Sequence, residues 1–179
     1  GQQNKLLADI NGLPMIVRTV DALSASKVAS ITVVLGHEAE QVRAALSGKR
    51  VEFVENRDYA AGLSTSLRCG IAAISQEVEC ALVCLGDMPQ ITPLEIDALL
   101  DDFAPTEGRA ICVPTHGGKR GNPVVIGQRF FAEIHDIEGD VGARHLIGAY
   151  PELVHEVEME GDAILLDIDT PEALARLTG

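Results

Sequence analysis

The sequence contains no tryptophan, and only 3% of its 179 residues are aromatic. A core without large rings must be built from Leu, Ile, Val and Ala, and hydrophobic residues supply 46% of the chain. Cores of this kind are typical of the buried strands of a parallel sheet. The length and apolar content predict one folded domain over residues 1–179 rather than a disordered polypeptide.

Basic residues are also scarce. The chain contains 14 Lys and Arg residues and 27 Asp and Glu residues, which gives a net charge of −13. A nucleic-acid backbone requires a basic face, and anionic membranes repel an acidic surface, so neither partner is expected. The sequence shows no apolar run of transmembrane length and no signal peptide, which makes the cytoplasm the default compartment. The acidic charge makes a divalent cation a plausible partner.

The four cysteines include no CxxC pair. Cys80 and Cys84 lie in one apolar run, and on a strand they share a face roughly 13 Å apart, at about 3.3 Å per residue. Buried thiols in a reducing compartment are therefore expected, rather than a disulfide or a metal site.

Strand-like and helix-like patterns alternate along the chain. Strands are expected over residues 30–35, 51–54, 79–85, 109–114, 123–126, 153–159 and 163–168. Helices are expected over residues 14–25, 38–46, 64–74, 92–103, 140–148 and 171–177, with Ser64 as a possible N-cap and a capping box from Thr92 to Glu95. This order predicts an α/β fold with a mostly parallel, partly mixed sheet. Ligands of such sheets bind beyond the carboxyl ends of the strands.

Two acidic motifs follow apolar runs directly. Gly86 and Asp87 come after the run that ends at Leu85, and Asp167 and Asp169 come after residues 163–166. Mg²⁺ takes one or two carboxylates and completes its octahedron with phosphate oxygens and waters. The two motifs together favour a shared metal, whereas each one taken alone also fits an Asx turn or a helix cap.

Hydroxyl and basic residues mark three further segments. Residues 62–68 place Ser64 and Ser66 at the start of a helix, where they can bind an anion or a base edge or simply cap the helix. Residues 117–123 and 139–144 each combine glycines with cations, namely Lys119, Arg120 and Arg144. Positive charge gathered in an acidic chain suggests a phosphorylated acceptor, and a plain hairpin turn and a plain helix start are the alternatives.

These motifs, in this order and over essentially the whole chain, resemble the molybdenum cofactor cytidylyltransferases and the related guanylyltransferases and sugar-nucleotide transferases. The family opens with a strand and a Gly-rich loop that ends in Gly and is followed by Asn-Lys-Leu-Leu. Here Gly1 matches the last loop glycine, and residues 4–7 match the tail. The opening strand and most of the phosphate loop are therefore expected to lie before Gly1. The resemblance implies a three-layer, Rossmann-like fold of the nucleotide-diphospho-sugar transferase type.

The resemblance also implies roles for individual residues. Nucleotide binding falls to Gly1, Lys5, Ser64, Ser66 and Gly86, with Lys5 on the triphosphate and the serines near the base. Asp87 and Asp169 become Mg²⁺ ligands, and Lys5 and Asp87 the catalytic pair. The acceptor side is implied to comprise Arg120, Asn122, Asp140 and Arg144. The family often has His where this chain has Asn122, which leaves the identity of the acceptor open.

The reaction implied is attack by an acceptor phosphate on the α-phosphorus of a nucleoside triphosphate, with release of pyrophosphate. CTP and a molybdopterin-type acceptor are the favoured substrates, and a molybdenum hydroxylase is a possible partner. Use of GTP, or transfer to a sugar 1-phosphate, remains an alternative within the same class. A non-catalytic carrier of molybdenum cofactor is the alternative from another class.

Overall fold

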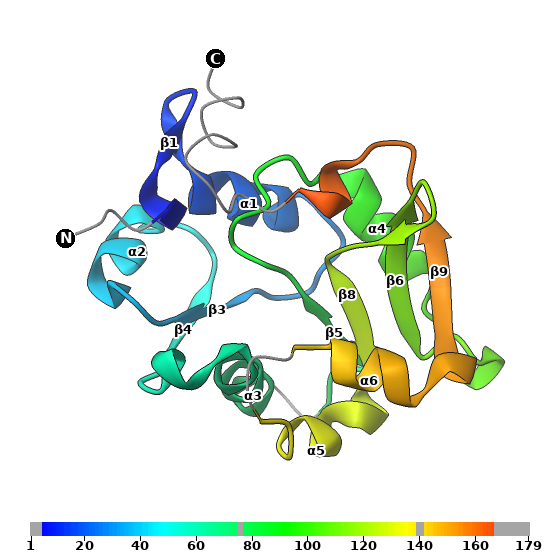
Figure 1. Cartoon of the computed structure of the whole chain (residues 1–179). Helices are drawn as coiled ribbons and strands as arrows, with labels where there is room; N and C mark the ends of the chain where they lie inside the picture. Colours follow the sequence, from blue (N-terminus) through cyan, green and yellow to red (C-terminus); the bar gives the residue numbers. More distant parts are fainter. Residues whose placement is uncertain (1–4, 75–76, 139–141, 167–179) are drawn as a thin grey trace.

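The computed structural model describes residues 5–74, 77–138 and 142–166, in a three-layer α/β arrangement (Figure 1). The strands are β1 (Asp9–Ile10), β2 (Leu13–Pro14), β3 (Thr32–Leu35), β4 (Glu52–Glu55), β5 (Cys80–Val83), β6 (Ile111–His116), β7 (Lys119–Arg120), β8 (Val124–Gly127) and β9 (Val154–Glu158). The α-helices are α1 (Met15–Ser24), α2 (Ala39–Ala45), α3 (Leu63–Ala73), α4 (Pro93–Asp102), α5 (Phe131–Ile134) and α6 (Arg144–Ala149). The expected fold class is confirmed.

The sheet is mixed, as the sequence predicted. β3 pairs with β4 in parallel, and β6 pairs with β9 in parallel. β8 lies between β5 and β6 and runs antiparallel to both, while β7 forms a hairpin with the end of β6. β6, β7 and β8 follow one another without an intervening helix, which allows the antiparallel β6–β7 and β6–β8 pairs, whereas α4, β6 and β7 separate β5 from β8 in the sequence.

The described residues form this sheet in two parts. β3 and β4 make one part, and β5, β8, β6, β7 and β9 make the other, without a pairing between β3 and β5. Every residue of β8 is buried, whereas every residue of β5 is only partly buried although its sequence is entirely apolar.

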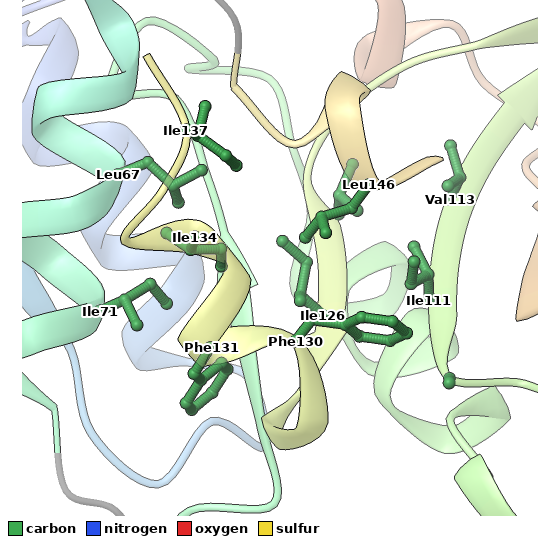
Figure 2. Close-up of a cluster of buried hydrophobic side chains, with 12 residues drawn as sticks. Leu67, Ile71, Ile111, Val113, Ile126, Phe130, Phe131, Ile134, Ile137 and Leu146 are labelled. Carbon is green, nitrogen blue, oxygen red and sulfur yellow. The ribbon is translucent and has the colours of Figure 1, made fainter. Parts of the chain in front are cut away.

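Alternating side chains of the sheet enter two cores. Ile111 and Val113 of β6 face the core that α3, α5 and α6 cover, where Leu67, Phe131 and Leu146 meet them (Figure 2). Cys112, between them in the sequence, faces the opposite core under α4, with Ile96 and Leu99. This period of two is the one a strand buried on both faces requires. A third core joins α1 and α2 to Leu35 of β3.

The expectation of buried thiols is met by Cys112, whereas Cys69, Cys80 and Cys84 are partly buried. Cys80 and Cys84 both pack against the core under α4, and all four cysteines are free thiols. Burial raises the pKa of the Cys112 thiol to about 11, with a smaller contribution from Asp102. That thiol therefore stays protonated at neutral pH.

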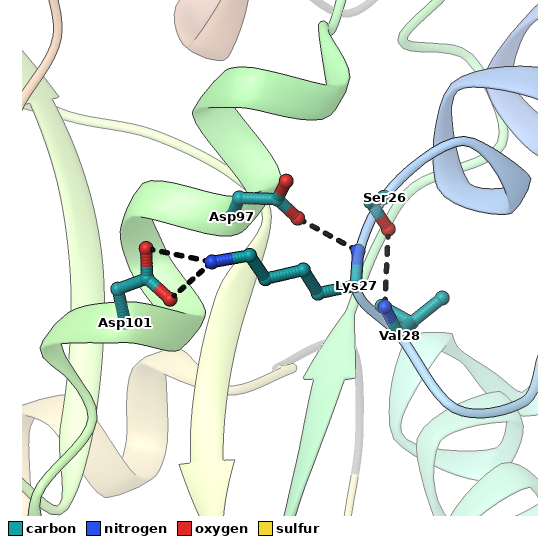
Figure 3. A network of polar contacts seen from close by, with 5 residues as sticks. All are labelled: Ser26, Lys27, Val28, Asp97 and Asp101. Carbon is teal, nitrogen blue, oxygen red and sulfur yellow. Dashed lines mark hydrogen bonds and ion pairs between the residues drawn. The ribbon is translucent and has the colours of Figure 1, made fainter.

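Helix α4 confirms its predicted start. The Thr92 hydroxyl accepts a hydrogen bond from the Glu95 amide at 3.2 Å, and the Glu95 carboxylate accepts one from the Thr92 amide at 3.0 Å. Each bond satisfies an amide that a helix start leaves without a partner. Lys27, just after α1, connects the end of that helix to α4. Its backbone amide donates to Asp97 at 2.7 Å, and its ammonium donates to Asp101 at 3.0 Å (Figure 3).

Two local expectations were wrong. Ser64 does not cap α3, because the helix begins at Leu63 and Gly62 takes the cap position without a side-chain bond. The run after Ala163 is a 3₁₀ helix, η6 (Ala163–Leu165), rather than a strand. Its Ile164 carbonyl accepts from the Asn122 amide at 2.9 Å, a single bond to a loop rather than a strand ladder. A short apolar run fits either conformation, so tertiary contacts decide.

One hairpin was not expected. β1 and β2 pair through a turn at Asn11 and Gly12, whose φ angles are 49° and 96°. An Asn-Gly pair between short strands is the strongest local hairpin signal, so the sequence contained the information. Arg18 of α1 donates to the Ile10 carbonyl at 2.6 Å and thereby holds this hairpin against the helix.

The described residues include no helix that is both long enough and apolar enough to cross a lipid bilayer.

Candidate active site

A buried carboxylate and a lysine meet beyond the end of β5. Asp87 is only 7% exposed, and its Oδ2 atom lies 2.8 Å from the Nζ atom of Lys5. Lys5 lies in the short helix η1 (Lys5–Leu7), and its side chain is 47% exposed. The pair therefore combines a fixed anion with a cation that a ligand in solvent can reach. The sequence singled out both residues, and the fold brings them together across 82 positions of the chain.

The peptide before Asp87 is held from two sides. A Cβ atom on Gly86 would lie 2.9 Å from the Ile16 side chain and 3.1 Å from that of Leu6, so only glycine fits without displacing them. The Thr19 hydroxyl, on α1, donates to the Gly86 carbonyl at 2.9 Å, and Thr19 is 2% exposed. These contacts limit movement of the backbone that carries the Asp87 carboxylate. Sequence reasoning missed Thr19, because no local signal links it to a loop 67 residues away.

The donor chemistry at Asp87 fits a divalent metal ion whose coordination a substrate completes. Within residues 5–74, 77–138 and 142–166, no three His, Cys, Asp or Glu side chains gather closely enough to hold an ion. A hard cation such as Mg²⁺ needs only one or two carboxylates when phosphate oxygens and waters supply the rest. Asp87 supplies one such carboxylate. Asp169, the other expected ligand, lies outside the described residues, and residues 163–165, where a strand leading to it was expected, form the 3₁₀ helix η6.

A pocket of about 230 Å³ opens next to the Asp87 loop. Its walls come from the residues on either side of Gly86 and Asp87, from the end of β7 with the loop that follows it, and from η6. The lining residues are Leu85, Met88, Arg120, Gly121, Asn122, Ile164 and Leu165. The structure thus brings two of the predicted acceptor residues, Arg120 and Asn122, to the neighbourhood of the predicted metal ligand.

Gly121 explains how η6 comes so close to this pocket. A Cβ atom at this position would lie 2.1 Å from the Ile164 carbonyl oxygen, which excludes any residue larger than glycine without backbone movement. Arg120 pairs with Glu156 of β9 at 2.9 Å, and both side chains are about half exposed. Such exposed pairs contribute little free energy, so the guanidinium can exchange Glu156 for a ligand phosphate at low cost.

Arg144 lies elsewhere. It is exposed at the start of α6 and is not among the residues that line this pocket. Gly142, two positions earlier, approaches the Leu63 side chain at the start of α3, since a Cβ atom there would lie 3.1 Å from it. Of the expected acceptor residues, Arg120 and Asn122 therefore line this pocket and Arg144 does not. The segment before Arg144 therefore contacts the start of α3 at Leu63.

The two serines differ in their surroundings. Ser64 is 1% exposed and faces the interior, whereas Ser66 is partly exposed. Asn56, which follows β4, donates to the hydroxyl oxygens of both Thr65 and Ser66 at 2.9 Å. The segment predicted to bind nucleotide, residues 62–68, is therefore held by a polar network around Asn56 rather than by a Ser64 cap. Of the other expected site residues, Gly1 and Asp140 lie outside the described residues, as does the expected helix over residues 171–177.

Cys84 is close to the site but is not a nucleophile in this state. Burial raises the pKa of its thiol to about 12, with a smaller contribution from the negative charge of Asp87. The thiolate, and not the thiol, is the reactive form, so Cys84 is unreactive at neutral pH.

The fold and the site define an α/β domain with a carboxylate and a lysine at the carboxyl edge of its sheet. Residues 1–155 match the model of the MobA-like NTP transferase domain, and the chain belongs to this family. It is therefore a protein of the nucleotidyltransferase class.

Named relatives and solved structures agree with this membership. The chain is 30% identical over 149 residues to a molybdenum cofactor cytidylyltransferase of Escherichia coli, covering 82% of this chain and 71% of the relative. It is 25% identical to a nicotine blue oxidoreductase of Paenarthrobacter nicotinovorans, covering 99% and 89%. A manganese complex of a Mycobacterium tuberculosis protein superposes with a TM-score of 0.83 at 25% identity, covering 97% of this chain and 90% of that one.

Proposed function

We propose that this protein is a divalent-metal-dependent nucleotidyltransferase that moves CMP from CTP to the phosphate of a molybdopterin-type acceptor. The observation that carries the proposal is the Lys5–Asp87 pair, which stands beside a pocket lined by Arg120 and Asn122. A fixed carboxylate, an accessible cation and a second basic residue are what two phosphorylated substrates require. The Escherichia coli relative bears the name of this activity.

Each residue has a role in the proposed reaction. Asp87, with Asp169 as the second expected ligand, would hold Mg²⁺, and Lys5 would neutralise the triphosphate. When bound, the metal supplies charge neutralisation for the phosphates. A phosphate oxygen of the acceptor attacks the α-phosphorus, and the bond to the bridging oxygen breaks, so pyrophosphate leaves with the electron pair. The attacking phosphate is already an anion at neutral pH, and no general base is needed.

The remaining expected residues divide between the two substrates. Gly1, Gly86, Ser64 and Ser66 are assigned to the nucleotide. Arg120 and Asn122 are assigned to the acceptor, because they line the pocket next to the Asp87 loop. Asp140 and Arg144 keep their predicted acceptor roles. Catalysis then rests on positioning and on charge neutralisation rather than on covalent chemistry.

Pyrophosphate release by the natural polypeptide tests the function directly. CTP, GTP, ATP and UTP are compared with Mg²⁺ or Mn²⁺, with and without a molybdopterin-type acceptor. Acceptor-dependent release from CTP supports the proposal, and release from GTP alone favours the guanylyl alternative. Binding of acceptor without release from any nucleotide would identify a carrier instead. The same assay separates transfer from the redox chemistry named for the Paenarthrobacter relative, which produces no pyrophosphate.

Replacing Arg120 with Ala is expected to raise the KM for the acceptor about tenfold and to leave the KM for CTP within about twofold, because a charged hydrogen bond to phosphate contributes roughly 1.5–3 kcal/mol. Steady-state kinetics with each substrate varied in turn measures the effect. Arg109→Ala is the matched control, since Arg109 forms a comparable exposed pair with Glu107 at 3.0 Å. Equal losses for both substrates would contradict the assignment of Arg120 to the acceptor.

A further inference from the structure

Asn56 is a buried polar residue between two elements of the candidate site. It directly follows β4, is 6% exposed, and donates its backbone amide to the Leu35 carbonyl of β3 at 2.7 Å. Its side chain contacts the first turn of α3. The residue therefore links the carboxyl end of the β3–β4 pair to the helix that carries the expected nucleotide ligands.

The orientation of the Asn56 amide follows from its backbone partner. The Asp58 amide lies 3.0 Å from one terminal atom of the Asn56 side chain. A backbone N–H can only donate, so that atom must be the oxygen. The nitrogen consequently faces the hydroxyl oxygens of Thr65 and Ser66, at 2.9 Å from each.

This orientation determines what the two hydroxyl groups can do. The amide nitrogen has two hydrogens, and each is donated to one hydroxyl, so both hydroxyl oxygens act as acceptors. Thr65 donates its own hydrogen to the Gly62 carbonyl at 2.7 Å. Ser66, by contrast, finds no acceptor for its hydrogen in the part of the chain that the structure describes.

Ser66 also lies on the open side of the helix. Leu63, three positions earlier and hence on the same face, is 45% exposed. Ser64 and Thr65 are turned inward, at 1% and 7% exposure, whereas Ser66 is partly exposed. The unused hydrogen therefore has a route to a ligand.

We infer that Asn56 is a positioning residue that makes the Ser66 hydroxyl an outward donor for an oxygen acceptor of the bound nucleotide. The inference rests on the proposed function, because it takes the ligand to be a nucleoside triphosphate. A carbonyl oxygen of the base and a phosphate oxygen share this chemistry. Asn56 itself touches no substrate and acts through the serine.

A double-mutant cycle tests this coupling. Asn56→Asp keeps an oxygen for the Asp58 amide but replaces the donor to Ser66 with an acceptor, so the serine hydrogen turns inward. Asn56→Asp and Ser66→Ala are each expected to raise the Kd for CTP about 3- to 10-fold, the value of one hydrogen bond. In the Ser66→Ala background, Asn56→Asp should add less than about twofold. If Asn56→Asp raises the Kd for CTP in the Ser66→Ala background as much as it does in the wild type, Asn56 has only a structural role and the inference is overturned.

Further variants and ligands make the cycle decisive. Ser66→Thr keeps the hydroxyl and should retain CTP affinity even if the Asn56 variant folds poorly. Ser26→Ala removes a hydroxyl that bonds the Leu23 carbonyl at 2.6 Å, away from the site, and serves as control. Titration with inorganic tripolyphosphate distinguishes a base carbonyl oxygen from a phosphate oxygen as the partner of Ser66. Loss of a base contact in Ser66→Ala changes the affinity for CTP alone, whereas loss of a phosphate contact changes the affinity for both ligands. Unchanged affinity for both ligands in Ser66→Ala overturns the inference.

Failure of the inference and failure of the proposed function give different results. If the wild type releases no pyrophosphate, the proposed function is refuted, but the double-mutant cycle on the Kd for CTP can still be measured. If the wild type turns over but the cycle shows no coupling between Asn56 and Ser66, the inference about Asn56 is refuted and the proposed function stands.

Discussion

Replacing Asp87 with Asn should lower the rate of pyrophosphate release about 10³-fold, the loss typical of removing one preorganised charge interaction at a reacting phosphate. The amide keeps the volume of the side chain but loses the charge that pairs with Lys5 at 2.8 Å and that fits a divalent cation. The fold should survive, because Gly86 is held by packing and Met88, on the other side, is 1% exposed. Measurement of kcat with Mg²⁺, together with thermal melting, separates these effects.

Asp97→Asn is the control for this substitution. Asp97 accepts a hydrogen bond from the Lys27 amide at 2.7 Å, so the change removes a carboxylate that is bonded but lies in the α1–α4 contact. Its activity should stay near that of the wild type. Retention of activity by Asp87→Asn, at a level similar to that of the Asp97 variant, would remove Asp87 from the proposed mechanism.

Completion of the sheet is the other large expected effect. A strand that pairs with both β3 and β5 should raise the melting temperature by about 10–20 °C relative to residues 1–179 alone, because a domain of this size gains about 2–4 °C per kcal/mol. The described residues give β3 only β4 as a partner and β5 only β8. Backbone groups left unpaired in a buried edge cost about 1–3 kcal/mol each, and several are involved.

The family resemblance implies such a strand together with a phosphate loop. Hydrogen exchange of a polypeptide that carries both, compared with residues 1–179 alone, measures protection of the β3 and β5 amides. Amides of β6, which pairs with both β8 and β9, should exchange alike in the two proteins. Affinity for nucleoside triphosphate should also rise, because loop N–H groups form the phosphate cradle. Equal melting temperatures and equal exchange at β3 and β5 would refute the added strand.

Local chemistry predicted much of the architecture. The capping box at Thr92 and the alternation of Ile111, Cys112 and Val113 each depend on neighbours in the sequence, and both are present in the structure. The position of Asp87 after an apolar run was equally local. The apolar run at Ala163 was not predicted correctly, because its conformation depends on the approach of Gly121 to the Ile164 carbonyl from another part of the chain.

The sequence by itself determined the α/β class, helices α1 to α4 and α6, most strands, and the residue types able to bind phosphate and metal, because these follow from periodicity and side-chain chemistry. Only the tertiary structure decided which of them meet. It joined Lys5 to Asp87, placed Arg120 by the pocket and Arg144 at α6, and set Thr19 against Gly86. Distances between such residues depend on strand order and on helix packing, which no local pattern encodes.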